Sequence, residues 1–269
     1  MGAKINLNEK NVVKSYNEHK NVHKVAEIFN VSYTPIKRIL TSNGYNLTNR
    51  RYTVNDEYFE NIDTEEKAYW LGFLFADGYI RDRNHGKSLE MKLGIKDKNH
   101  LELFRKCIKS THNITESFNK VKYKDGYSIS HLCWLAIYSD KLVESIKKQG
   151  VHSRKTFTIQ PPLNVPKKLL RHFIRGYFDG DGCICFNRKT KRGVVGIVSA
   201  SPNFKKFLIE FILKECNVPT IYEGNIEIQI QTKFGIVNFL SYIYKNSKIY
   251  LKRKKDIYDE FERYVKQKP

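Results

Sequence analysis

The chain has 269 residues, and 48 lysines and arginines against 28 aspartates and glutamates give it a formal net charge of +20. This excess indicates a polyanionic partner such as nucleic acid. No segment approaches the roughly 18 consecutive apolar residues of a spanning helix, so the sequence predicts no membrane partner. The five cysteines are odd in number and lack paired spacing, which argues against a disulfide framework and a zinc site.

The N-terminal segment, MGAKINLNEKN, has no apolar stretch of the kind found in secretory signals. Together with the unpaired cysteines, this predicts a reducing, intracellular setting. We expect the cytoplasm of a bacterium or of a phage-infected host, with an organelle as the alternative.

Residues 1–45 are predicted to form a small all-α unit. Apolar residues recur at helical intervals over residues 9–19 and 22–29, and a third helix is predicted from Tyr33 to Ser42. The segment HKVAEIFNVSYTPIKRILTSNGY resembles the helix-turn-helix of resolvase-like and invertase-like DNA-binding proteins. That resemblance implies that Lys37 and Arg38 face a major groove. The alternative is a helical unit that only packs.

Residues 46–62 are polar and charged, with little periodicity, and are predicted to form a linker. Asp63 and Glu66 then have the spacing of a capping box, which predicts that a helix begins here.

A related segment occurs twice in the chain. Residues 69–80 read YWLGFLFADGYI, and residues 173–184 read FIRGYFDGDGCI, so an apolar helical stretch ends in Asp-Gly both times. Each copy also carries two small residues four positions apart, on one face of a helix: Gly72 with Ala76, and Gly176 with Gly180. Small residues at this spacing let helix backbones approach closely. We therefore expect the two helices to cross along these faces.

Such a crossing would bring Asp77 and Asp181 side by side, each followed by a glycine that we expect to reverse the chain. Two carboxylates in that position repel each other and face the negative ends of their own helix dipoles. A divalent cation between them would relieve both effects.

The segments WLGFLFADG and IRGYFDGDG resemble the motif for which the LAGLIDADG homing endonucleases are named. Both copies keep the final Asp-Gly, whereas the motif's earlier Asp is Phe75 in the first copy and Asp179 in the second. The resemblance implies an α+β fold of two pseudo-symmetric LAGLIDADG repeats, each an antiparallel saddle-shaped sheet with helices on one face. The N-terminal helix-turn-helix precedes them, with repeat 1 at residues 63–160 and repeat 2 at residues 161–269.

The resemblance also implies a site-specific double-strand DNA endonuclease that uses Mg²⁺, with Mn²⁺ as a substitute. Asp77 and Asp181 would bind the ions that activate water and stabilise the leaving oxygen. The metal site would include the adjacent Ala76 and Gly180.

Lysines near the end of each repeat support such sites in this family. Lys155 and Lys254 match them by position, with Lys252 as an alternative. Asp97 is a further candidate in repeat 1, although repeat 2 has Ala200 or Ser201 near the corresponding position.

The repeat extends beyond the motifs. Asp77 and Asp181 are 104 positions apart, and Lys155 and Lys254 are 99 positions apart. In both copies the pattern predicts two extended segments, a helix, a hairpin and a second helix. The four predicted helices cover residues 99–109, 140–149, 203–216 and 234–244. This order indicates a duplicated domain with a pseudo-twofold axis.

The alternation in residues 225–232, NIEIQIQT, predicts a strand with Ile226, Ile228 and Ile230 toward the core. Its other face would present side chains that match adenine and cytosine edges: Glu227, Gln229 and Gln231. Basic residues after the motifs and in the first hairpin extend this predicted DNA-contact surface: Arg81, Arg83, Lys120, Lys122, Lys124, Arg188, Lys189 and Arg192. The alternative for each of them is a solvated surface charge.

We therefore expect a monomer that binds double-stranded DNA at a long asymmetric target. A catalytically retired DNA-binding regulator and an RNA intron maturase are the alternatives. The presence of both motif aspartates favours the nuclease.

Overall fold

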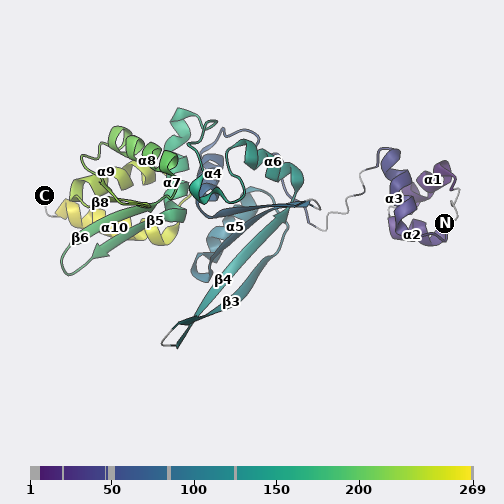
Figure 1. The fold of residues 1–269 in the computed structure, drawn as a ribbon, viewed down its shortest axis with the longest axis horizontal. Coiled ribbons are helices and arrows are strands. Elements are labelled where there is room, and N and C mark those ends of the chain that lie inside the picture. Colours follow the sequence, from purple (N-terminus) through teal and green to yellow (C-terminus); the bar gives the residue numbers. More distant parts are fainter. Residues whose placement is uncertain are drawn as a thin grey trace. The chain divides into compact units, whose positions relative to one another are not determined.

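The computed structural model of the chain describes residues 7–19, 21–45, 47, 52–83, 86–123 and 126–267. These residues form two compact units, Met1–Arg51 and Tyr52–Pro269 (Figure 1). Within the described ranges, no helix combines the length and the apolar character that crossing a bilayer requires.

The smaller unit is a three-helix bundle with its own core. Its helices are α1 (Glu9–His19), α2 (Val22–Ile28) and α3 (Tyr33–Ser42). Val12, Val25 and Ile36 are fully buried between them. Ser32 occupies the N-cap of α3 with extended backbone angles, although its side chain makes no capping hydrogen bond. The three predicted helices are confirmed, whereas their helix-turn-helix function remains a prediction.

The predicted linker over residues 46–62 extends too far. Residues 46 and 48–51 lie outside the described part of the chain, but residues 52–62 belong to the larger unit. Tyr58, Phe59 and Ile62 are buried in the core of that unit. These isolated apolar side chains in a polar segment therefore anchor it to the larger unit.

The predicted capping box at Asp63 and Glu66 is also not formed. Thr64 is the N-cap of helix α4 (Glu65–Asp77), and its hydroxyl accepts a hydrogen bond of 3.2 Å from the Lys67 amide. Glu66 instead accepts a 2.6 Å hydrogen bond from the Tyr58 hydroxyl. The helix begins where it was predicted, but its N-cap is Thr64 and not Asp63.

The larger unit contains two repeats with the same order of elements, to which repeat 2 adds the helix α10 (Figure 1). Repeat 1 runs through α4, β1 (Gly78–Arg83), β2 (Gly86–Gly94), α5 (Lys98–Cys107), β3 (Ile114–Tyr123), β4 (Gly126–Tyr138) and α6 (Asp140–Lys148). Repeat 2 runs through α7 (Leu170–Asp181), β5 (Gly182–Asn187), β6 (Arg192–Val198), α8 (Pro202–Glu215), β7 (Tyr222–Glu223), β8 (Glu227–Ile230), α9 (Lys233–Tyr244) and α10 (Lys252–Gln267). Three short 3₁₀ segments connect these elements: Ile95–Asp97, Lys155–Phe157 and Lys167–Leu169.

Both sheets are antiparallel and four-stranded, with the equivalent orders β1-β2-β4-β3 and β5-β6-β8-β7. The predicted α+β fold of two repeats is therefore confirmed. Each sheet has one face buried against helices, where Leu89, Leu135, Val195 and Ile228 lie. We call the other side of each sheet its open face.

The strand predicted over residues 225–232 is shorter than expected. Strand β8 begins at Glu227, and Ile228 and Ile230 are buried as predicted. Ile226 precedes the strand and is 55% exposed, so its predicted core position is wrong. Its carbonyl instead accepts a 2.7 Å hydrogen bond from the Ser199 amide at the end of β6.

Helices α4 and α7 cross at backbone contact. A Cβ atom on Gly72 would lie 1.9 Å from the carbonyl oxygen of Phe173, and one on Gly176 would lie 1.9 Å from that of Tyr69. Closer to the helix ends, a Cβ on Gly180 would lie 2.3 Å from the Cβ of Ala76. Any side chain at either central glycine would therefore separate the helices.

Replacing Gly176 by alanine should lower the free energy of unfolding by about 1 to 3 kcal/mol or more, because the added methyl meets backbone that cannot rotate away. Denaturant unfolding of the two proteins measures this difference. Gly94→Ala is the matched control, since a Cβ there would meet nothing closer than 3.9 Å. Equal stability of the wild type and Gly176→Ala would contradict the close crossing.

Candidate active site

Each motif helix ends directly on its aspartate. The following residues, Gly78 with φ −72° and ψ 134° and Gly182 with φ −94° and ψ 163°, are extended and start the next strand. The prediction that these glycines reverse the chain is wrong. They lack a side chain because of space: a Cβ would lie 2.6 Å from the Leu74 carbonyl oxygen at Gly78, and 2.5 Å from that of Phe178 at Gly182.

The helix crossing brings the two aspartates into one electrostatic environment, as predicted. The Asp77 carboxylate lies against Gly180, where a Cβ would be 3.2 Å from Asp77 Oδ2. Burial, with a second contribution from the charge of Asp181, raises the pKa of Asp77 to about 6. Burial also raises the pKa of Asp181, and the charge of Lys155 opposes this shift.

A lysine lies at the end of each motif helix. Lys155 Nζ donates to the carbonyls of Ala76 at 3.0 Å and Gly78 at 2.6 Å. Lys254 Nζ makes the equivalent contacts on the second helix with four main-chain carbonyls, those of Phe178, Asp179 and Gly182 and, at 3.5 Å, Gly180. These amines offset the partial negative charge that accumulates at a helix C-terminus.

Both amines are placed where deprotonation becomes easier. Burial lowers the pKa of Lys155 and lowers that of Lys254 to about 8. Lys252, the alternative to Lys254, lies at the surface and pairs with Asp256 at 2.7 Å. The structure thus places Lys155 and Lys254 beside the paired aspartates and leaves Lys252 away from them.

The motif's earlier acidic position is structural in repeat 2. Asp179 is buried and accepts three hydrogen bonds, from the Tyr69 hydroxyl at 2.8 Å, the Tyr244 hydroxyl at 2.6 Å and the Leu251 amide at 2.7 Å. Its counterpart, Phe75, is buried among apolar residues. This position therefore packs inside each repeat, through hydrogen bonds at Asp179 and through apolar contacts at Phe75. The replacement of the motif's acidic residue by Phe75 does not remove either of the paired aspartates.

Asp97 joins the two repeats. Arg253 Nε lies 3.0 and 3.1 Å from the two oxygens of Asp97, whose side chain is largely buried. At the corresponding place in repeat 2, the Ser201 hydroxyl donates to the Ile159 carbonyl at 2.6 Å. Asp97 therefore fixes the start of α10, the helix that carries Lys254.

The two aspartates suit a hard divalent cation but do not complete its coordination. In the part of the chain that the structure describes, no three or more His, Cys, Asp or Glu side chains form a group able to hold a metal. The raised pKa of Asp77, to which the charge of Asp181 contributes, nevertheless indicates a repulsion that a cation between the two carboxylates would relieve. The predicted neighbours, Ala76 and Gly180, could add carbonyl oxygens, although Lys155 already donates to the Ala76 carbonyl. Water and phosphate oxygens would supply the remaining ligands.

Space for a cation and its remaining ligands exists beside Asp181. A cavity of about 200 Å³ is lined by residues of both motif helices and of the connecting segments, including Ala76, Lys155, Tyr177, Asp181 and Ser199. Tyr177 also donates a 2.8 Å hydrogen bond to the Val198 carbonyl.

The open face of the repeat 1 sheet carries Arg81 and Arg83, as strand alternation predicts. Arg81 makes a bidentate contact with Glu90 at 2.6 and 2.9 Å. Lys92 and Trp134 share this face and are exposed; the same alternation could have identified them.

Two predicted DNA contacts in repeat 1 lie on the other side of the sheet. The register of β3 and β4 places Lys120 opposite Ile129 and Lys122 opposite Tyr127, on the side that continues to buried Cys133 and Leu135. A strand alternates strictly, so these lysines face away from Arg81. Lys124 lies outside the described residues.

The open face of the repeat 2 sheet carries the predicted polar row. Gln229 Nε2 donates to Glu227 at 3.1 Å, and Gln231 Nε2 donates to Gln229 at 2.9 Å. Arg192 follows the same alternation on the neighbouring strand and is exposed. Arg188 is instead held by Glu260 of α10 through two 2.7 Å hydrogen bonds, and Lys189 lies exposed in the adjoining turn.

In the smaller unit, Lys37 and Arg38 are exposed on α3. They lie outside the buried side of that helix, which is formed by Ile36, Ile39 and Leu40. This exposure is compatible with the predicted groove contact, which remains a prediction.

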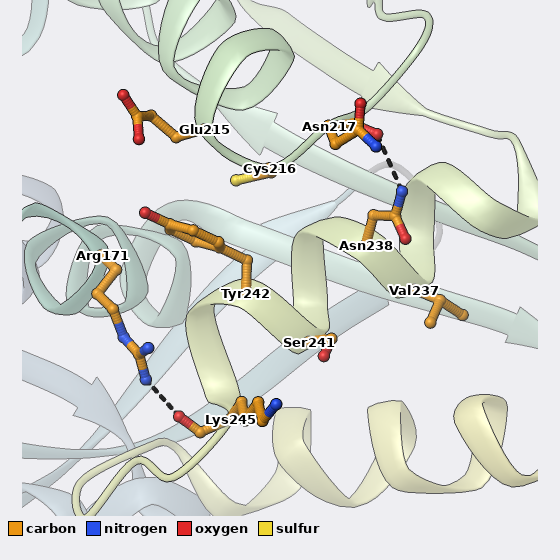
Figure 2. Close-up of a pocket in the computed structure, with 9 residues that line it drawn as sticks. All are labelled: Arg171, Glu215, Cys216, Asn217, Val237, Asn238, Ser241, Tyr242 and Lys245. Carbon is orange, nitrogen blue, oxygen red and sulfur yellow. Dashed lines mark hydrogen bonds between the residues drawn. The ribbon is translucent and has the colours of Figure 1, made fainter.

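A separate pocket of about 370 Å³ lies between the start of α7, the end of α8 and α9 (Figure 2). Figure 2 shows Arg171 and Tyr242 on one side of it and the Asn238 side chain donating to the Asn217 carbonyl, at 2.9 Å, on the other. Neither motif aspartate lines this pocket. It therefore plays no part in the candidate active site.

Comparison with known proteins supports this assignment of the fold. Residues 168–265 match the sequence profile of a family described as the LAGLIDADG-like domain. A comparison with curated proteins gave no match. The LAGLIDADG meganuclease I-AabMI, bound to uncleaved DNA, is 12% identical with a TM-score of 0.50, over 74% of this chain and 91% of its own. The homing endonuclease I-WcaI, bound to its DNA recognition sequence, is 15% identical with a TM-score of 0.51, over 78% of this chain and 94% of its own.

At these identities, the similarity establishes the fold: the larger unit has the two-repeat architecture of the LAGLIDADG homing endonucleases. The repeat that carries Asp181 also matches the domain family in sequence. The chemistry of the paired aspartates is a separate question.

The raised pKa of Asp77 makes stability depend on pH in a defined direction. Its folded value of about 6 exceeds the ordinary value of 3.8, so the folded state binds the proton more tightly and becomes less stable as pH rises between these values. Without divalent metal, Asp77→Asn should therefore be more stable than the wild type at pH 8, by about 1 to 3 kcal/mol. The difference should shrink toward pH 4.

Urea unfolding in EDTA at several pH values measures this, with Asp256→Asn as the control for loss of an exposed carboxylate. A stability difference that is independent of pH would show that Asp77 is not held in a charge-disfavouring site.

Proposed function

We propose that this protein is a site-specific endonuclease that hydrolyses one phosphodiester bond in each strand of duplex DNA with a divalent metal, Mg²⁺ or in its place Mn²⁺. The observation that carries the proposal is the pair of buried aspartates with raised pKa values at the ends of two helices in backbone contact. The resemblance to homing endonucleases and the DNA-bound proteins of the same fold support it.

Asp77 and Asp181 would hold the metal, with one carboxylate from each repeat. The bound cation would supply Lewis-acid stabilisation of negative charge on the reacting phosphate and on the leaving oxygen. Lys155 and Lys254 would act as positioning residues, because their amines hold the carbonyls that end the two helices. A lysine that fixes a helix end also fixes the carboxylate on that end.

The open faces of the two sheets would bind the duplex. Arg81 and Arg83 with Lys92 in repeat 1, and Arg192 in repeat 2, would neutralise phosphates or contact guanine. Glu227, Gln229 and Gln231 form a row of amide and carboxylate groups suited to base edges. The net charge of +20 would strengthen every such contact.

Asp77→Asn and Asp181→Asn should each abolish double-strand cleavage while leaving DNA binding largely intact, because each removes a metal ligand without changing the open faces. Cleavage is measured with Mg²⁺ on the DNA that flanks the gene, and binding is measured in Ca²⁺ or EDTA. Asp256→Asn, which removes an exposed carboxylate on α10, is the matched control and should cut at the wild-type rate.

Either aspartate variant cutting both strands at a near wild-type rate would refute the assigned site. A wild-type protein that binds the DNA specifically and never cuts it would indicate the retired regulator. Tight binding to RNA transcribed from the sequence around the gene, without DNA cleavage, would indicate the maturase.

The smaller unit should provide a second DNA contact. Deleting residues 1–45 would then weaken binding and shorten the footprint, because the second engagement is intramolecular in the full chain. Each lost phosphate contact should reduce the salt slope of log K by about 0.9. The cleavage position should not move, since both aspartates and both sheets remain.

Footprinting and a salt titration of the full-length and truncated proteins on one duplex measure these effects. Lys37→Gln with Arg38→Gln in the full chain tests the contact without deletion. Identical footprints and slopes in all three proteins would show that the smaller unit does not bind this DNA.

A further inference from the structure

The β3–β4 hairpin extends beyond the rest of the repeat 1 sheet as an arm (Figure 1). Its strands pair without interruption from Ile114 opposite Leu135 to Tyr123 opposite Gly126. Beyond Leu132, the side that is buried elsewhere in the sheet is no longer covered, since Ile129 there is 65% exposed whereas Cys133 is fully buried. The arm therefore presents two exposed faces.

The two faces differ in chemistry. On the open face lie small polar side chains, including Ser117, Asn119, Ser128 and Ser130. On the opposite face, three cross-strand rows form what we call the aromatic–lysine patch: Phe118 with His131, Lys120 with Ile129, and Lys122 with Tyr127. Small polar groups suit close contact with base edges in a groove. The aromatic–lysine patch lies on the opposite face, so a duplex bound to the open face would leave it free.

The rings of the aromatic–lysine patch are exposed and are held in defined orientations. Phe118 is 72% exposed and Tyr127 is 61% exposed. Phe118 stacks on His131 with ring centroids 4.3 Å apart, and Lys120 Nζ lies 4.0 Å from the centroid of Tyr127. These contacts restrict the rings before any ligand arrives, which lowers the conformational cost of binding.

We propose that the aromatic–lysine patch binds single-stranded DNA, independently of the duplex site on the open faces. Flat rings offer stacking surfaces to unpaired bases, and the adjacent lysines complement the phosphates; this combination is how single strands are bound without sequence preference. Alternate residues of a strand are about 6.8 Å apart, which equals about two stacked base steps. None of the three rows contains a carboxylate. Glu116, in the adjoining row, lies 2.8 Å from His131 Nε2 and is also paired with Lys98 at 2.7 Å, so the patch is complementary to a polyanion mainly at Lys120 and Lys122.

Duplex DNA fits this patch less well than a single strand does. Bases in a duplex are stacked on one another and shield their flat surfaces, so exposed rings gain little from contact with it. A second copy of the chain would bury the apolar rings but would bring Lys120 and Lys122 close to their own equivalents. Charge complementarity therefore favours the single strand.

The test uses the full chain in EDTA, so that cleavage does not contribute. Binding is measured by the anisotropy of a fluorescent oligothymidylate of about 12 nucleotides over a range of salt concentrations. At high salt the electrostatic attraction is weakened, so the contribution of stacking is easier to detect. Phe118→Ala and Tyr127→Ala should each raise the Kd by about tenfold. Lys120→Gln with Lys122→Gln should reduce the salt slope by about 0.7 for each lysine.

Ser117→Ala with Ser130→Ala, on the open face of the arm, is the matched control and should leave oligonucleotide binding unchanged. Unchanged affinity of Phe118→Ala and Tyr127→Ala would overturn the proposal, as would markedly stronger competition by unlabelled oligouridylate than by unlabelled oligothymidylate, which would assign the patch to RNA. Loss of a dimer in these variants, seen by sedimentation with no change in Kd, would instead assign the patch to a second copy. Cleavage of duplex DNA is measured separately, so failure of one proposal is distinguishable from failure of the other.

Discussion

The backbone contact between α4 and α7 determines the position of most other features. Gly72 and Gly176 bring the two helices so close that neither could carry even a methyl group there. Since both helices end on an aspartate, this contact forces two carboxylates into one buried site. Burial raises the pKa of both, and the charge of Asp181 adds to the shift of Asp77. The unfavourable pair exists because favourable packing fixes its geometry. The pKa values stay raised although Lys155 and Lys254 lie nearby, and carboxylates shifted in this way by burial and a neighbouring charge are frequent at functional sites.

The two repeats stabilise their motif helices by different means. In repeat 2, Arg175 is fully buried and donates to Glu65 at 2.8 Å and to the carbonyls of Ile243 and Ile249, while Asp179 accepts from two tyrosines. In repeat 1 the helix is held mainly by apolar and aromatic packing. Because the Glu65 and Tyr69 contacts come from α4, the polar network of repeat 2 also holds the two repeats together. The network therefore stabilises the crossing itself.

The paired motif, the order of elements and both lysines could be predicted because each depends on a local pattern or on the spacing between two copies. The structure departs from prediction where the outcome depends on contacts distant in sequence. Three buried apolar side chains hold residues 52–62 to the larger unit although the segment reads as polar, together with hydrogen bonds such as the one that the Asn55 amide donates to the Ile108 carbonyl at 2.8 Å. The face on which Lys120 and Lys122 lie depends on the register of β3 against β4, and one residue of slip would exchange the faces. The extended angles at Gly78 and Gly182 follow from side-chain crowding that the sequence does not show.

Duplication has produced two sheets with the same strand order but unequal surfaces. Strand β3 has ten residues and its counterpart β7 has two, so only repeat 1 carries a long arm. The open face of repeat 1 presents arginines, a lysine and aromatic side chains, whereas that of repeat 2 presents a row of two amides and one carboxylate beside a single arginine, Arg192. A duplex that lay along both faces would therefore meet different donors and acceptors on its two halves. A palindromic target would present the same groups to both sheets. The unequal sheets therefore favour an asymmetric target, even though the paired aspartates are related by pseudo-twofold symmetry.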